Sequence, residues 1–132
     1  MSTEIKQTEA KYDWHVETMN VSVHGFSGDL KLRYRRIGPE FTVDTLEYRI
    51  NKGGHTGGNK ANINFKVTGG NGATIITDSP DSMIQDGNWR PYARNVKLNI
   101  SNATTAIIEV EFIFDRTAGA DPRGMAIRHL TI

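Results

Sequence analysis

Cysteine is absent from this chain of 132 residues. The chain therefore has no disulfides, no thiolate nucleophile and no cysteine-ligated zinc site, which fits a reducing compartment. Long apolar runs are also missing: the run from Ala106 to Ile108 is broken at once by Glu109, whereas a transmembrane helix needs roughly 20 apolar residues. The first residues lack the apolar stretch of a secretory signal. We therefore expect no transmembrane segment and, by default, a cytoplasmic protein, with unconventional secretion left open.

Positive and negative side chains are nearly balanced in number. The 16 Lys and Arg residues and 15 Asp and Glu residues give a net charge of +1, which argues against the broad basic surface of nucleic-acid-binding proteins. Hydrophobic residues make up 37% and charged residues 23%, as in soluble globular proteins. A chain of this length suits one core. We expect a flexible N-terminal arm over residues 1–11 and a single domain over residues 12–132.

What the chain does have is apolar residues at every second position, in short segments separated by turns that contain glycine and proline. This alternation is typical of strands with one buried face. The clearest segments are 30–35, 46–50, 63–67, 96–100 and 108–114, and weaker ones are 14–23, 41–43, 73–77 and 125–132. Within 14–23 and 125–132 the alternation changes phase, which predicts a bulge or a change of sheet.

No stretch of ten or more residues keeps a helical period with caps, so no helices are available to connect parallel strands. The pattern predicts an all-β protein: an antiparallel two-sheet β-sandwich, jelly-roll-like, with about eight strands. Lys31, Arg33 and Arg35 form a basic row on the outer face of one predicted strand, and Glu109 and Glu111 form an acidic row on another. If these two strands were adjacent, the opposite charges would stabilise their pairing.

Catalytic patterns are not found. The histidines stand at positions 15, 24, 55 and 129, in none of the spacings that place two imidazoles on one metal. There is no GxSxG elbow to mark an activated serine. We expect no enzyme, no catalytic residues, no cofactor and no metal site. A structural Ca²⁺ ion is a minor alternative, because Asp78, Asp81, Asp86 and Asn88 gather near turns, although such residues are also ordinary turn formers.

Two loops could bind a ligand. "NKGGHTGGNKAN", residues 51–62, is either a flexible hairpin loop or a loop whose glycines let a ligand approach, with His55 and Asn59 as polar contacts. "QDGNWRPYARNVKLNI", residues 85–100, brings aromatic, basic and amide side chains together beside a turn. Its candidate ligand-binding residues are Asp86, Asn88, Trp89, Arg90 and Tyr92. Aromatic rings beside such groups suit sugar recognition, but a tryptophan there can equally close the end of the core.

Residues 88–132 resemble the C-terminal half of a galactose-binding-like jelly-roll domain of the carbohydrate-binding-module type. The resemblance rests on "NWRPYARNVKLNI", the polar turn "SNATT", the alternating "AIIEVEFIF" and the last strand "MAIRHLTI". It implies a non-catalytic, lectin-like module that binds a carbohydrate at its loops, with Trp89, Arg90 and Tyr92 at the centre and His55 and Asn59 at the rim.

The alternative is a self-assembling interaction protein, or a toxin-like component, that binds no sugar. Contacts between copies would then use the N-terminal arm or an exposed sheet edge. A homo-oligomer fits both interpretations, because weak sugar sites gain avidity when several copies are joined.

Overall fold

The computed structural model describes residues 13–132, so the predicted arm over residues 1–11 lies outside the described residues. Every regular element within the described range is a strand. The strands are β1 (His15–Val23), β2 (Phe26–Ile37), β3 (Glu40–Asn51), β4 (Asn62–Gly69), β5 (Thr74–Asp78), β6 (Arg90–Pro91), β7 (Asn95–Asn99), β8 (Thr105–Ile113) and β9 (Arg123–Thr131). Residues 13–132 include no helix long and apolar enough to cross a membrane.

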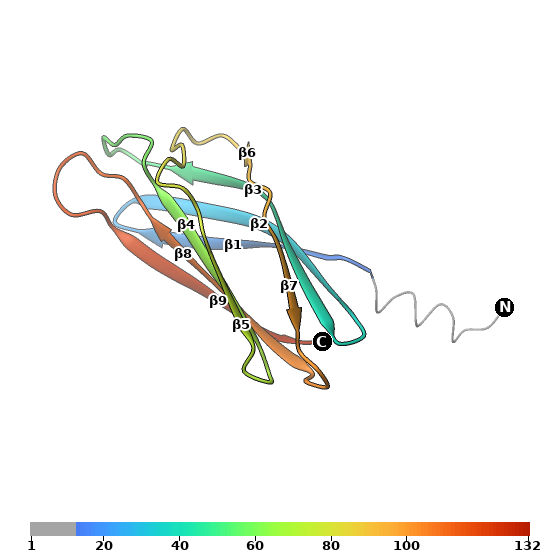
Figure 1. Ribbon diagram of the computed structural model, residues 1–132. Coiled ribbons are helices and arrows are strands. Elements are labelled where there is room, and N and C mark those ends of the chain that lie inside the picture. The colour runs from blue at the N-terminus through green and yellow to red at the C-terminus, as the bar shows by residue number, and fades with distance from the viewer. Residues whose placement is uncertain (1–12) are drawn as a thin grey trace.

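The strands form two antiparallel sheets that pack face to face (Figure 1). One is a five-stranded sheet in the order β1-β2-β3-β6, in which β7 also pairs with β3, and the other is a four-stranded sheet in the order β5-β4-β8-β9. The chain changes sheet between β3 and β4, between β5 and β6, and between β7 and β8. The predicted all-β sandwich is confirmed. It has nine strands where the sequence predicted about eight, because the alternation gave no signal for the two-residue β6.

Strand β3 joins two segments that the sequence separated. Lys31 pairs with Glu47 and Leu32 pairs with Thr45, so Leu46 is an extra residue in the register. Such a bulge reverses the side-chain phase of the strand. This explains why the alternations over residues 41–43 and 46–50 have opposite phase although both belong to one strand.

The phase changes predicted within residues 14–23 and 125–132 are wrong. β1 pairs with β2, and β9 with β8, without any shift of register. The apolar residues that suggested a change lie instead on the outer faces of the sheets, where Val16 is 60%, Met125 54% and Ile127 50% exposed. Trp14 is on the outer side as well, over two arginines of β2.

The two charged rows also lie on different sheets. Lys31 and Arg33 of β2 pair with acidic residues of β3, whereas Glu109 pairs with Lys66 of β4. Between the sheets, the buried core is dominated by large apolar side chains. Its largest fully buried members are Phe26, Phe41, Phe65, Phe112, Phe114, Met19, Leu30, Leu32, Ile50, Ile63, Ile100 and Ile108. Gly28 is required in this core because a Cβ there would lie 2.4 Å from the Phe112 ring.

The sandwich has two different ends (Figure 1). At the end that we call the loop end, the long connections gather, over residues 52–61, 79–89 and 114–122, with the short turn at 24–25. At the opposite end, the hairpin end, lie the turns at 38–39, 70–73 and 100–104, and the last residues of β9.

Candidate functional site

Trp89 lies on the outer face of the five-stranded sheet and is partly exposed. The Nζ of Lys31 is 4.8 Å and the Cζ of Arg49 is 4.6 Å from the centroid of its ring. Both cations point outward because they alternate with buried residues on β2 and β3. Each contact of a cation with an indole contributes about 0.5–1 kcal/mol at an exposed site. The ring is therefore held against the sheet surface and is not part of the core.

Trp14 occupies an equivalent place on the same face. It immediately precedes His15, which pairs with Tyr34, so Trp14 stands beside Arg35. Its ring centroid is 4.0 Å from the Cζ of Arg33 and 4.2 Å from the Cζ of Arg35. Sequence reasoning missed this residue as a candidate. The signal was present, because Trp14 is out of phase with the buried residues of β1.

Acidic side chains complete this surface. The ion pairs are Lys31–Glu47 at 3.4 Å, Arg33–Asp44 at 3.0 Å and Arg49–Asp29 at 3.0 Å. Arg35 forms no ion pair with any of residues 13–132. We call this surface the tryptophan face and define it by Trp14, Trp89, Lys31, Arg33, Arg35 and Arg49. It combines two partly exposed indoles with hydrogen-bond donors and acceptors.

Arg90 and Asp86 bind each other next to Trp89. The Nε of Arg90 donates to Oδ1 of Asp86 at 3.3 Å, and its Nη2 donates to Oδ2. The Arg90 guanidinium lowers the pKa of Asp86 to about 2, and the backbone N–H of Asn88 acts in the same direction. Both carboxylate oxygens of Asp86 are thus engaged, and the pair stabilises the turn that leads to Trp89.

Tyr92 is buried, with 7% of its surface exposed. Its ring packs edge-on against Tyr48 with the centroids 6.3 Å apart, and burial raises the pKa of its hydroxyl. Its backbone N–H donates to the carbonyl of Leu46, and its carbonyl accepts from Thr45 Oγ1. Tyr92 therefore closes the core beside β3, and the exposed stacking role that the sequence suggested does not fit its position.

His55 and Asn59 lie at the loop end and make their contacts there. The His55 ring stacks on Phe26 at 4.8 Å with an interplanar angle of 5°, and its Nε2 is 2.5 Å from the carbonyl of His24. The Oδ1 of Asn59 accepts from the backbone N–H of Gln85 at 3.1 Å. Both residues thus fasten their loop to neighbouring segments.

Gln85 is the centre of this end, and sequence reasoning missed it. Its side chain is 1% exposed and donates from Nε2 to the carbonyls of Gly58 at 3.0 Å and Asp115 at 2.8 Å. Its Oε1 accepts from the backbone N–H of Asp115 at 2.9 Å. One glutamine therefore joins all three long loops. Nothing in its sequence context distinguishes it from a solvated loop residue.

The glycines of residues 51–62 let a neighbouring loop approach. A Cβ at Gly57 would lie 2.1 Å from the carbonyl oxygen of Asp115, and one at Gly58 would lie 2.6 Å from the Asp115 carboxylate. The small residues that suggested room for a ligand therefore admit residue 115 of the same chain.

Metal-ligating groups are not clustered in the described part of the chain, since residues 13–132 contain no group of three or more His, Asp or Glu side chains that could hold an ion. Asp81 is exposed, and Asp78 lies at the end of edge strand β5. Structural Ca²⁺ stays a prediction.

Comparisons of this chain with protein-family models, with curated proteins and with solved structures found no match.

Proposed function

We propose that this chain is a non-catalytic glycan-binding module and that the tryptophan face is its binding surface. Sugar rings pack their C–H faces on aromatic rings, while charged and amide groups hydrogen-bond the hydroxyls. Trp14 and Trp89 supply two rings on one sheet face, and the cations beside them hold each ring in place. Rings held in this way lose little conformational entropy on binding. This pair of indoles on one face is the observation that carries the proposal.

The spacing of the indoles favours an oligosaccharide over a single sugar. Trp14 lies over Arg33 and Arg35 of β2, centred near position 34. Trp89 lies over Lys31 of β2 and Arg49 of β3. Arg49 pairs with Asp29, so Trp89 is centred near position 30 of β2. Four residues along a strand correspond to about 13 Å. A ligand that stacks on both rings must therefore extend along β2.

The proposed surface differs in part from the one suggested by the sequence. Trp89 remains at its centre, with Arg90, Asp86 and Asn88 beside it at the turn, and Trp14 is added. His55, Asn59 and Tyr92 are engaged in packing and loop contacts, so we leave them out of the surface. The resemblance of residues 88–132 to carbohydrate-binding modules supports the same function.

A glycan array tests this proposal, with wild type, Trp14→Ala, Trp89→Ala and the control Lys60→Ala, which removes an exposed side chain at the loop end. We expect wild type and the control to bind the same glycans and each tryptophan variant to bind at least about tenfold more weakly. Melting temperatures should stay close to that of wild type. Undiminished binding by both tryptophan variants would contradict the proposal.

Self-association is a second candidate function, and one surface favours it. Ile76, Met125 and Ile127 are 65%, 54% and 50% exposed, all on the outer face of the four-stranded sheet. Apolar side chains grouped on one face are typical of interaction sites. Light scattering of wild type and of Ile127→Glu tests this: a dimer or larger assembly that the variant disrupts supports association through this face, and a monomeric wild type excludes it.

A further inference from the structure

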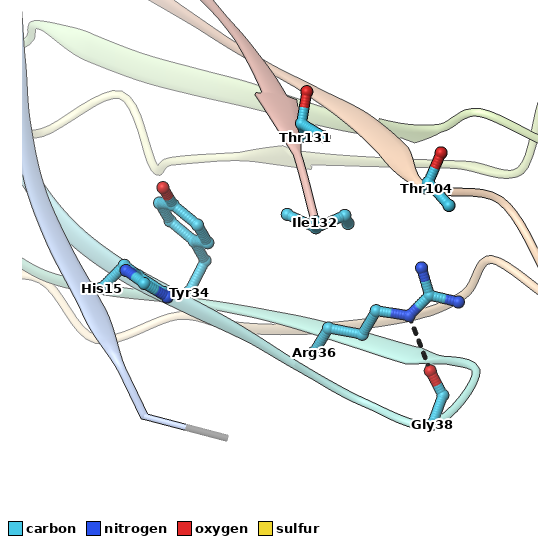
Figure 2. A pocket seen from close by; sticks show the side chains of 7 residues that line it. All are labelled: His15, Tyr34, Arg36, Gly38, Thr104, Thr131 and Ile132. Carbon is cyan, nitrogen blue, oxygen red and sulfur yellow. Dashed lines mark hydrogen bonds between the residues drawn. The ribbon is translucent and has the colours of Figure 1, made fainter. Parts of the chain in front are cut away.

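A cavity of about 570 Å³ opens at the hairpin end, between the two sheets. Its lining comes from four separate parts of the chain (Figure 2). The lining residues are His15, Tyr34, Arg36, Gly38, Thr104, Thr131 and Ile132. Binding sites for small molecules usually have volumes of about 300–1,000 Å³, so the cavity is large enough for one. It lies on the inner side of β1 and β2, whereas the tryptophan face lies on their outer side.

The inner face of the five-stranded sheet changes character where the cavity begins. Along β2 the inward positions are apolar through Leu30 and Leu32, and then become Tyr34 and Arg36. Along β1 the inward Met19 is followed, towards the same end, by Glu17 and His15. Inward positions of a sandwich are normally apolar, so polar residues in this phase need another reason.

Arg36 brings a positive charge to the cavity and forms no ion pair with a carboxylate of residues 13–132. Its Nε donates to the carbonyl of Gly38 at 2.7 Å, its Nη2 donates to that of Ser101 at 2.9 Å, and its Nη1 donates to that of Ala103. These neutral acceptors hold the guanidinium in one place and leave two of its five N–H donors unassigned. The nearby Arg128 is different, because it pairs with Glu17 at 3.0 Å.

The walls of the cavity beside Arg36 combine two rings and the Ile132 side chain with the hydroxyls of Thr104 and Thr131. His15 and Tyr34 stack with their centroids 5.3 Å apart at an angle of 21°. Figure 2 shows the Ile132 side chain between the Tyr34 ring and the Arg36 guanidinium. The cavity therefore offers a fixed cation at one side and a flat ring wall at the other.

We propose that this cavity binds a small molecule that carries an oxyanion, a carboxylate or a phosphate, on an aromatic or other flat apolar body. The oxyanion accepts hydrogen bonds from Arg36, and the apolar body packs against Tyr34, His15 and Ile132. A planar guanidinium with N–H donors to spare is well suited to either oxyanion. This site is separate from the tryptophan face and does not depend on glycan binding.

Amide chemical shifts measured by NMR during titration with benzoate, phenyl phosphate and neutral benzyl alcohol test the proposal. We expect at least one of the two anions to bind with a Kd of about 1 mM and to shift amides at residues 15, 34–38, 104 and 131–132. Benzyl alcohol, which lacks the charge, should bind at least about tenfold more weakly. The relative strength of benzoate and phenyl phosphate identifies the oxyanion.

Two variants separate the contribution of the Arg36 charge to binding from that of the aromatic wall. Arg36→Gln should weaken anion binding about tenfold, whereas Arg94→Gln, which removes an exposed arginine at the other end of β7, should leave it unchanged. Tyr34→Leu removes the aromatic wall and should weaken all three probes, which keeps the test informative if Arg36→Gln unfolds the turn. The proposal is overturned if neither anion shifts these amides at millimolar concentration, or if benzyl alcohol binds as well as they do.

Discussion

The loop end and the hairpin end of this sandwich differ in how far they are closed. At the loop end, Gln85, Asn59 and His55 each bind backbone groups or rings of neighbouring segments, and Gln85 is almost fully buried. At the hairpin end, His15, Tyr34 and Arg36 surround an open cavity. The long loops at the loop end therefore pack against one another, whereas the hairpin end, with its short turns, has an open cavity.

The difference shows what long loops require. Loops contribute many backbone donors and acceptors, and buried ones need partners. Side chains such as Gln85 supply those partners, so polar residues in loops have a structural use that competes with ligand binding. At the hairpin end, Arg36 meets the same need by donating to the carbonyls of Gly38, Ser101 and Ala103, but the shorter turns leave the cavity beside it open.

Gln85→Ala is expected to have the largest effect on stability. It removes three part-buried side-chain hydrogen bonds and takes these partners from two carbonyls and one N–H, at a cost of about 3 kcal/mol in the free energy of unfolding. Tyr34→Phe at the hairpin end removes a hydroxyl that lines the cavity and should cost less than about 0.5 kcal/mol. Urea denaturation measures both. Equal losses for the two variants would remove the distinction between the ends.

Glycine substitutions compare how tightly the backbone is packed at the loop end and at the hairpin end. Gly57→Ala should destabilise the protein by about 2 kcal/mol, because its Cβ would lie 2.1 Å from the carbonyl oxygen of Asp115. Gly38→Ala at the hairpin end has open space around its Cβ but a φ of +58°, so only the left-handed backbone conformation costs energy, about 1 kcal/mol. Thermal denaturation of both variants checks the order, and a more stable Gly57→Ala than Gly38→Ala contradicts the close loop contact.

Trp89→Ala should destabilise the protein by only about 1 kcal/mol, because the ring lies on the sheet surface and its removal takes away the contacts with Lys31 and Arg49. A tryptophan that closed the core would cost about 3–5 kcal/mol instead. Urea denaturation distinguishes these values. A loss near the larger figure would move Trp89 from the tryptophan face into the core.

The Asp86–Arg90 pair should have the smallest effect, present near neutral pH and lost in acid. Arg90 lowers the pKa of Asp86 to about 2. A lowered pKa in the folded state means that the ionised carboxylate adds stability above its usual pKa near 4, and that this stability is lost as the pH falls towards 2. Unfolding of wild type and Asp86→Asn at pH 6 and pH 2 should therefore differ more at pH 6. The difference should shrink in high salt, because the pair is exposed; a difference that does not depend on pH would contradict the pairing.

The sequence predicted the fold well, because burial of one strand face imposes a period of two that is visible in the residues themselves. The prediction failed where apolar residues lie on the outer face of a strand. Trp14 and Val16 suggested a phase change in β1, but Trp14 packs on the outer face against Arg33 and Arg35. The sequence also could not reveal the role of Gln85, since that side chain is buried by loops distant in sequence. The sequence predicted a role for Trp89 because it stands beside arginine and amide side chains next to a turn, and that role stays a prediction.

Chemical-shift mapping with a glycan that the array identifies shows whether glycans bind on the tryptophan face, with the loop end as a structural closure. We expect the largest shifts at the amides of residues 14, 29–35, 47–49 and 89. Shifts confined to residues 52–60 and 115–122 would contradict this expectation and would assign glycan binding to the loop end.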